Sequence, residues 1–397
     1  MDEMEFPTPD VEVDSIDPAT LKARIDAGER VVILDVRSEG NYAEWHIDGD
    51  GVESYNVPYF EFITEEFDRD LLGDVPDDEE VVILCAKGEA SAYVGGLMAE
   101  HGFDVIHLAD GMEGWARIYE CDELTRYDGV GSVYQYRRPS SGCLGYLVVD
   151  DDEAAVVDPL RAFVDRYLED AAALGADLQY AIDTHVHADH ISGVRDLVSE
   201  GVEGVLPAAA ADRGVAYADD VTLVDDGDTL AVGRATIQVV HTPGHTTGMT
   251  SYLVDGSVLL TGDGLFVESV ARPDLEKGDE GAPDAARQLH ETLHERILTL
   301  DHDVVVGGGH YSDAAEPAAD GTYTATIGEL ADRMGVLSMG EDDFVERILA
   351  DMPPRPANFE DIIATNLGRR ETDDEEAFEL ELGPNNCAAS QEALTDD

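Results

Sequence analysis

Three histidines and an aspartate stand within six residues near the middle of the chain, directly after an apolar segment that ends at Ile182. They are His185, His187, Asp189 and His190. Neutral imidazole and carboxylate are the ligands that cations such as Zn²⁺ and Fe²⁺ prefer. The His-x-His spacing lets two rings from one loop converge on one ion, and leaves Asp189 and His190 free to face another. The sequence therefore predicts a metal site.

Three further candidate ligands follow, each at a point where an apolar β-type run meets glycine. They are His245, Asp263 and His310. Strand-to-loop positions bring residues that are distant in sequence to one edge of a sheet. Because every candidate has this context, scattered surface or core histidines explain the pattern poorly. Asp183 is expected either to orient a ligand histidine or to be a solvated turn residue.

The chain is strongly acidic, with 88 acidic and 24 basic residues and a formal charge of −64. Such charges repel one another unless concentrated salt screens them, with a Debye length of about 3 Å at 1 M. We therefore expect a halophilic, salt-rich cytoplasm. The hydrophobic content of 43% argues for folded domains rather than disorder. Nucleic acid is an improbable partner, because phosphate would be repelled.

Four dispersed cysteines are too few for a disulfide framework, so we expect a reducing interior. The N-terminus is acidic where a signal peptide would be basic and then apolar, and no apolar run approaches the ~20 residues of a membrane helix. The expected location is cytoplasmic, without a membrane partner. Three of the cysteines lie outside any motif and are assigned no chemistry: Cys121, Cys143 and Cys387.

The length predicts two domains, each with its own core. In the first, the continuous apolar runs 31–34 and 81–84 are typical of strands buried on both faces of a parallel α/β sheet. From Val133 the runs become short and alternating, which is typical of antiparallel strands in a sandwich. The predicted segments are an acidic extension (1–14), the first domain (15–122), the second domain with a C-terminal extension (128–370) and an acidic tail (371–397).

The first domain resembles the rhodanese family. The resemblance rests on Asp35-Val36-Arg37, on the loop from Cys85 to Ser91 and on Gly111-Met112-Glu113-Gly114-Trp115. It implies that Cys85 carries sulfane sulfur as a persulfide at a helix N-terminus. Ala90 stands where the family loop has arginine, and Lys87 replaces that charge only in part. The alternative is a rhodanese-like scaffold in which Cys85 is a buried apolar residue.

The second domain resembles the metallo-β-lactamase superfamily over roughly residues 130 to 330, which implies an αββα sandwich with metals at the sheet edges. Within that superfamily it resembles the persulfide dioxygenases. Three segments carry this closer resemblance: the His-rich run 184–193, the run 241–246, and Asp263 followed nine residues later by Arg272-Pro273-Asp274-Leu275. The segment 344–366 also looks like the C-terminal stretch of those enzymes.

This resemblance implies one Fe(II) per chain, held by His185, His245 and Asp263. Two histidines and a carboxylate form a facial triad that leaves positions open for O₂ and a small thiol persulfide, giving sulfite and free thiol. Arg272 would clamp a carboxylate of the thiol carrier, or else form a surface ion pair. The remaining candidates would contact substrate, orient ligands or build a second metal site: His187, Asp189, His190 and His310.

Two alternatives stay open at this point. One is a thioester hydrolase with two Zn(II) per chain, resembling glyoxalase II, in which a metal-bound hydroxide attacks the ester. The other is a non-catalytic sulfur-binding module with a structural metal, although structural zinc favours closed, cysteine-rich spheres. His290 and His294, four residues apart in a helical pattern, are expected on an exposed helix face. A homo-oligomer is compatible with the sequence.

Overall fold

The computed structural model describes the chain except for residues 1–10, 65–66, 313, 351, 384–387 and 390–397. Cys387 and most of the predicted acidic extension lie outside the described residues, as do eight residues at the C-terminal end. The chain divides into two compact units. The first comprises residues 1–118 with 382–384, and the second comprises residues 119–381 with 385–397.

The first unit is built on a five-stranded parallel sheet with the strand order β1-β5-β4-β2-β3. Every residue of β2 and β4 is buried, because apolar clusters cover both faces of the sheet. The predicted parallel α/β architecture is thereby confirmed. The strands are β1 (Ser15–Ile16), β2 (Val31–Asp35), β3 (Val52–Asn56), β4 (Val81–Leu84) and β5 (Val105–Leu108). The helices are α1 (Pro18–Asp26), α2 (Glu39–Glu44), α3 (Tyr59–Thr64), η1 (Arg69–Leu72), α4 (Glu89–Glu100) and α5 (Gly111–Ala116).

The second unit contains two sheets that face each other. The seven-stranded sheet has the order β12-β11-β10-β9-β8-β7-β6, and the six-stranded sheet has the order β13-β14-β15-β16-β17-β18. The first comprises β6 (Glu120–Glu123), β7 (Ser132–Arg138), β8 (Cys143–Asp150), β9 (Glu153–Val157), β10 (Asp177–Ile182), β11 (Glu203–Pro207) and β12 (Thr222–Val224). The second comprises β13 (Thr229–Val232), β14 (Ala235–His241), β15 (Thr250–Val254), β16 (Val258–Gly262), β17 (Val305–Gly308) and β18 (Thr324–Thr326).

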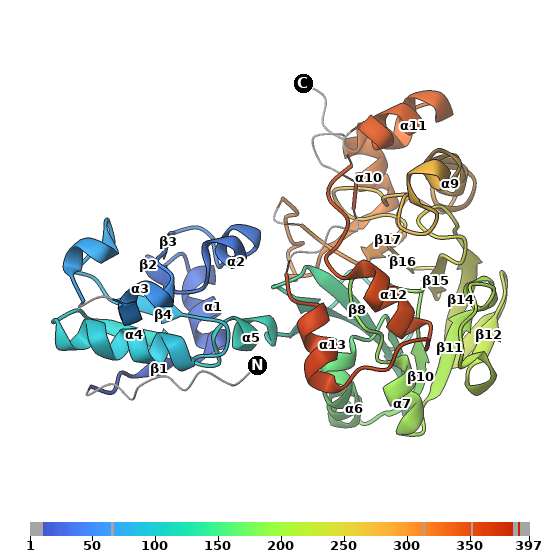
Figure 1. Ribbon diagram of the computed structural model, residues 1–397. Coiled ribbons are helices and arrows are strands. Elements are labelled where there is room, and N and C mark those ends of the chain that lie inside the picture. The colour runs from blue at the N-terminus through green and yellow to red at the C-terminus, as the bar shows by residue number, and fades with distance from the viewer. Residues whose placement is uncertain (1–10, 65–66, 313, 351, 384–387, 390–397) are drawn as a thin grey trace. The chain divides into compact units, whose positions relative to one another are not determined.

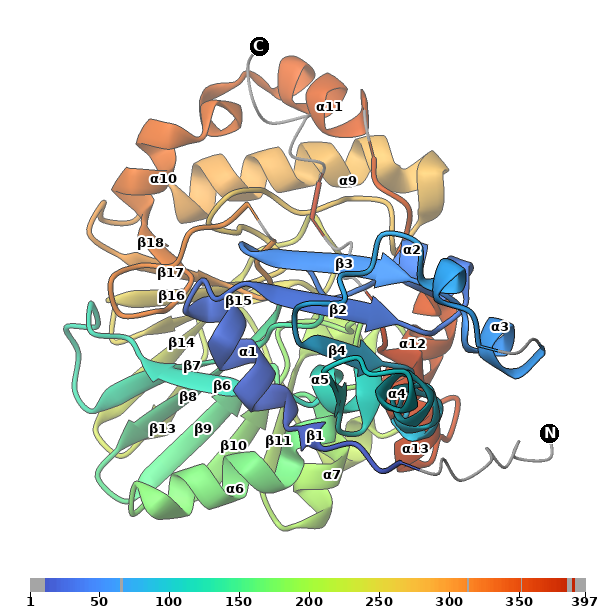
Figure 2. The same ribbon diagram turned by 90° about the vertical axis from the view of Figure 1, so that its left-hand side faces the viewer.

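Helices cover the outer face of each sheet (Figures 1 and 2). Tyr167 and Leu197 pack on the seven-stranded sheet, and Leu289 and Leu330 pack on the six-stranded one. The first set is η2 (Arg161–Phe163), α6 (Val164–Ala173), α7 (Val194–Ser199), α8 (Ala208–Ala211) and η3 (Ala218–Asp220). The second set is α9 (Gly278–Thr292), η4 (Leu293–Ile297), α10 (Ile327–Arg333), η5 (Gly335–Ser338) and α11 (Glu341–Ala350). Together with the core between the sheets, this confirms the αββα sandwich.

The candidate ligands lie where strands end. β10 ends at Ile182 just before the His-rich run, β14 ends before the turn that carries His245, and β16 ends immediately before Asp263. Gly262 has a φ of +48°, and a Cβ there would lie 2.4 Å from the hydroxyl oxygen of Thr184. Only glycine therefore allows β16 to approach the His-rich loop this closely.

The described C-terminal segment differs from the predicted acidic tail. Within the predicted tail, α13 (Asp374–Leu380) is a helix that buries Ala377 and Phe378, whereas α12 (Phe359–Asn366) precedes the tail in the predicted C-terminal extension. The tail prediction rested on the many acidic residues after position 371, which do not reveal that one face of α13 is apolar. None of the helices in the part of the chain that the structure describes has the length and apolar character that a membrane span requires.

The different burial of two strand leucines predicts that their replacement by alanine will change the free energy of unfolding by different amounts. Leu259 lies in β16 and Leu223 lies in β12. Leu259 is fully buried beneath α9, whereas Leu223 is 40% exposed. We expect Leu259→Ala to lower the free energy of unfolding by about 2 to 5 kcal/mol, because it leaves a cavity. Leu223→Ala should change it by less than about 1 kcal/mol. Urea unfolding in molar KCl measures both, and equal losses would contradict the assigned packing.

Candidate metal centre

Three side chains from separate loops converge in the core of the second unit. His185 Nε2 and His245 Nε2 each lie 3.7 Å from Asp263 Oδ2. All three side chains are at most 1% exposed. These three atoms have no hydrogen-bond partner among the described residues. Buried polar atoms are normally partnered, so three orphaned ligand atoms that converge on one point fit a metal ion.

Neighbouring groups orient both histidines with Nε2 toward this point. His245 Nδ1 donates to the carbonyl oxygen of Arg272 at 2.9 Å. His185 Nδ1 lies 2.9 Å from the Thr184 hydroxyl, which itself donates to Asp158. Burial lowers the pKa of both imidazoles, that of His185 well below its ordinary value. Both rings are therefore neutral near pH 7, as metal ligands must be.

His187 does not face the same point as His185. Its Nε2 lies 3.1 Å from Asp158 Oδ1 and 3.7 Å from Asp183 Oδ1. Burial lowers the pKa of His187, but the two carboxylates outweigh burial and raise it to about 9. The two rings of the His-x-His motif thus face different groups in this structure and do not converge on one point. Asp183 is 3% exposed and accepts from the Ser192 hydroxyl, so it is not a solvated turn residue.

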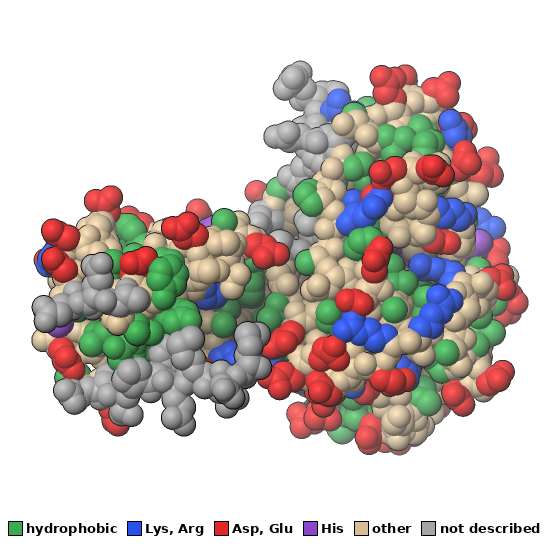
Figure 3. Space-filling view, viewed as in Figure 1, with side chains coloured by type: hydrophobic (Ala, Val, Ile, Leu, Met, Phe, Trp, Pro, Cys, Tyr) green, Lys and Arg blue, Asp and Glu red, His purple; other side chains and the backbone are tan. Residues whose placement is uncertain are grey.

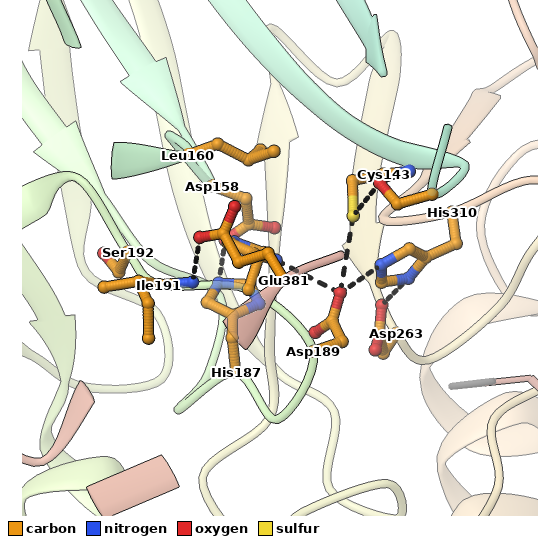
Figure 4. Close-up of polar contacts among 12 residues, drawn as sticks. Cys143, Asp158, Leu160, His187, Asp189, Ile191, Ser192, Asp263, His310 and Glu381 are labelled. Atoms are coloured by element: carbon orange, nitrogen blue, oxygen red, sulfur yellow. Dashed lines mark hydrogen bonds and ion pairs between the residues drawn. The ribbon is translucent and has the colours of Figure 1, made fainter. Parts of the chain in front are cut away.

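A second cluster lies beside the first and consists of Cys143, Asp189, His190 and His310. Figure 4 labels Cys143, Asp189 and His310 of this cluster. His310 bridges two carboxylates, with Nε2 2.8 Å from Asp189 Oδ2 and Nδ1 2.7 Å from Asp263 Oδ1. Burial lowers the pKa of His310, but these carboxylates outweigh it and raise the pKa well above the ordinary value. His310 is therefore a cation that donates to both carboxylates.

Cys143 joins this cluster although no local motif marks it. Its Sγ lies 3.5 Å from Asp189 Oδ2, and the residue forms an isolated β-bridge with His310. Burial and the Asp189 charge raise the pKa of Cys143, but hydrogen bonds with His190 and His310 outweigh them and lower it from 9.0 to about 7. The only sequence signal is its place at the start of a strand, which does not show what lies across that strand end.

Arg272 is not at the surface. It is 1% exposed, and its guanidinium donates to Asp274 and to the carbonyl oxygens of Pro353 and Pro354 at 2.8 to 2.9 Å. Its own carbonyl oxygen accepts from His245. Because the guanidinium already donates to these protein acceptors, the geometry favours a structural role for Arg272 over the expected clamp on a substrate carboxylate.

In the first unit, Cys85 lies in the loop that precedes α4. Its Sγ accepts the N–H of Gly88 at 3.0 Å and lies 3.5 Å from the Ser91 hydroxyl. Gly88 has a φ of +102°, a conformation that points its N–H back at the sulfur. Lys87 pairs with Glu113 at 3.3 Å, so its charge is not directed only at Cys85.

Among the described residues, Cys121, His290 and His294 belong to none of the possible metal groups. Cys121 is partly buried, and burial raises the pKa of its thiol to about 11. His290 and His294 stack on each other rather than lying fully exposed, and His290 packs against Phe344.

If these atoms hold a metal ion, replacing one of the three ligand residues should weaken metal binding, and replacing a histidine elsewhere should not. We expect His245→Ala to weaken Co(II) binding by the metal-free protein at least about 100-fold, because one of three protein ligands is removed. His294→Ala makes the same change outside the site and should leave the affinity unchanged. Titration against a competing chelator measures both, and equal affinities would refute this centre.

Comparisons with known proteins agree with the fold and with both sequence resemblances. The family model described as metallo-beta-lactamase superfamily matches residues 140–310, and the model described as rhodanese-like domain matches residues 17–118. The human protein named persulfide dioxygenase ETHE1, mitochondrial, is 29% identical over 259 residues, covering 62% of this chain and 92% of that protein. A hydroxyacylglutathione hydrolase from Synechococcus sp. (strain JA-3-3Ab) is 33% identical over 205 residues, covering 46% and 79%.

A solved structure of ETHE1 from Myxococcus xanthus superposes with a TM-score of 0.51 at 29% identity, covering 59% of this chain and 98% of that one. A metallo-beta-lactamase from Staphylococcus aureus superposes with a TM-score of 0.56 at 24% identity, covering 62% and 75%, and supports the fold alone. With the His and Asp metal site in this fold, these relatives identify a metal-dependent enzyme. The chain therefore belongs to the metallo-β-lactamase superfamily, and a rhodanese-like domain precedes its metal-binding domain in the sequence.

Proposed function

We propose that this protein is a persulfide dioxygenase that uses one Fe(II) held by His185, His245 and Asp263. Its substrates are a low-molecular-weight thiol persulfide and O₂. In the net reaction the S–S bond breaks, the outer sulfur gains two oxygen atoms from O₂ and one from water, and the products are free thiol, sulfite and two protons. The matched regions cover 92% of the human relative and 92% of the bovine relative. Both of these proteins are named persulfide dioxygenase.

The observation that carries the proposal is the composition of the first ligand group. It contains two histidines and one carboxylate, because His187 faces Asp158 and Asp183 instead. This is the donor set of the facial triad that non-haem Fe(II) oxygenases use. Bound Fe(II) supplies redox activation of O₂ and open coordination positions for sulfur.

The surrounding residues prepare the site for this chemistry. His310 holds a proton at Nδ1 against Asp263 Oδ1, which leaves Oδ2 as the oxygen directed at the two histidines. Its positive charge offsets the buried carboxylates of Asp189 and Asp263. The ligand residues and His310 are at most 6% exposed, so little of their surface contacts bulk water.

A dizinc thioester hydrolase is the second candidate. It is supported by the hydroxyacylglutathione hydrolase relatives, at 30 to 34% identity, and by the four-residue cluster around Asp189, which offers ligands for a second Zn(II). If two Zn(II) ions were bound, His310 would be one of the residues that hold the second, since it contacts both Asp189 and Asp263.

The two candidates differ in their need for O₂, which gives the test. We expect the full chain, loaded with Fe(II) under anaerobic conditions in molar KCl, to consume O₂ and to form an equal amount of sulfite when given a small-thiol persulfide. The zinc-loaded protein should do neither. Absence of O₂ uptake with several thiol persulfides, together with thioester cleavage by the zinc form, would favour the hydrolase. Asp263→Asn should abolish either activity, whereas a module that only binds sulfur would retain binding.

We further propose that Cys85 carries sulfane sulfur in the rhodanese-like domain. Its thiol accepts a backbone N–H at 3.0 Å and stands at the N-terminus of a 12-residue helix, a setting that stabilises an anionic sulfur. Ala90 stands where the family has arginine, so backbone groups replace the guanidinium as the source of this stabilisation.

Replacement of Cys85 tests this role directly. We expect Cys85→Ser to abolish sulfur transfer from thiosulfate or a persulfide to cyanide, because serine cannot hold sulfane sulfur. Cys121→Ser is the matched control in the same chain and should leave the transfer rate unchanged. Persistent transfer by Cys85→Ser would leave the domain with a scaffolding role.

A further inference from the structure

The loop that carries the His-rich motif, residues 183–192, is held by the C-terminal helices of the same unit. This metal loop contains no helix or strand, so its backbone groups need partners from elsewhere. α12 and α13 are two of the red helices in Figure 1, and their side chains contact this loop. Apolar contacts join them, since Ala188 packs with Phe359 and Ile363, and Ile191 packs with Ile362.

Asn366, the last residue of α12, makes three hydrogen bonds to this loop. Its Nδ2 donates to the carbonyl oxygens of His187 at 3.0 Å and His190 at 2.8 Å. Its Oδ1 accepts the N–H of Ser192 at 2.9 Å. The side chain is 5% exposed, so water does not compete for these bonds. One amide thus fixes the backbone on both sides of Asp189.

Glu381, which follows α13, completes the arrangement. Its Oε1 accepts the N–H of Ile191 at 2.7 Å, as Figure 4 shows, and its Oε2 accepts from Arg138 Nη1 at 2.7 Å. Arg138 is fully buried between the rings of Phe163 and Phe378. A buried carboxylate held by a buried arginine has little freedom to move, so the Ile191 N–H is anchored to the core.

From these contacts we propose that Asn366 and Glu381 are positioning residues of the metal site. They fix the backbone of the metal loop, so that His185 faces the metal while His187 faces Asp158. The inference rests on the metal site of the proposed function, but on neither of its candidate reactions. Residues that orient metal ligands without touching the metal typically change affinity by about 10- to 100-fold.

Asn366→Asp is the sharpest variant, because it keeps the acceptor for Ser192 and removes both donors to the loop carbonyls. Asn366→Ala removes all three bonds. Thr365→Val is the matched control. Thr365 is the buried neighbour on α12, and its hydroxyl donates to the carbonyl oxygen of Asp361 within the same helix. Glu381→Gln keeps an acceptor for Ile191 but weakens the pairing with Arg138.

The experiment is Co(II) titration of the metal-free full chain against a chelator in molar KCl, without O₂ or persulfide. We expect Asn366→Asp and Asn366→Ala to weaken binding at least about 10-fold and to change the visible absorption of bound Co(II). Glu381→Gln should have a smaller effect, and Thr365→Val should match the wild type. Unchanged affinity in both Asn366 variants, or an equal loss in Thr365→Val, would overturn the proposal.

Hydrogen exchange of the metal-free variants separates positioning from general instability. We expect Asn366→Asp to speed amide exchange within residues 184–192 while exchange in β8 and β16 stays at the wild-type rate. If Asn366→Ala does not fold, Asn366→Asp and Glu381→Gln decide the outcome by the same two measurements. Because Co(II) affinity needs no turnover, its result is independent of whether the protein oxidises persulfides or cleaves thioesters.

Discussion

The metal site depends on the burial of several carboxylates that the fold must compensate with positive charge. Asp158, Asp183, Asp189 and Asp263 are all at most 8% exposed. A buried carboxylate is costly unless it is paired and hydrogen-bonded. Protonated His187, His190 and His310 offset part of this charge, and the orphaned Oδ2 of Asp263 remains beside two neutral imidazoles. The loops around the sheet edge are arranged so that a cation completes this balance.

Orientation of the ligands extends well beyond the ligands themselves. Arg272 offers its carbonyl oxygen to His245 while its guanidinium is held by Asp274 and by the chain around Pro353. The C-terminal segment therefore contacts the surroundings of the site in two places. Pro353 accepts a hydrogen bond from Arg272, and Asn366 donates to the metal loop. The described part of this segment contributes no residue to the metal groups, yet it packs against the metal loop.

One chain joins the rhodanese-like domain to the metal-binding domain. A tether raises the effective concentration of one site for a product of the other, which suits a labile persulfide. The residues that we assign to each proposed step lie within one unit. Cys85 accepts its backbone N–H within the first unit, and the three candidate metal ligands all belong to the second.

The sequence by itself determined the ligand types and their places at strand ends, because apolar runs that meet glycine and histidine mark where a sheet edge presents side chains. Strand patterning also indicated the parallel sheet of the first domain and the antiparallel strands that begin the second, while the family resemblance implied the αββα sandwich. The tertiary structure alone decided that His187 faces Asp158, that Cys143 meets Asp189, and that Asn366 reaches the metal loop. These contacts join residues 29, 46 and 176 positions apart. No local pattern encodes such pairs, since they exist only once the sheets have packed and desolvated the site.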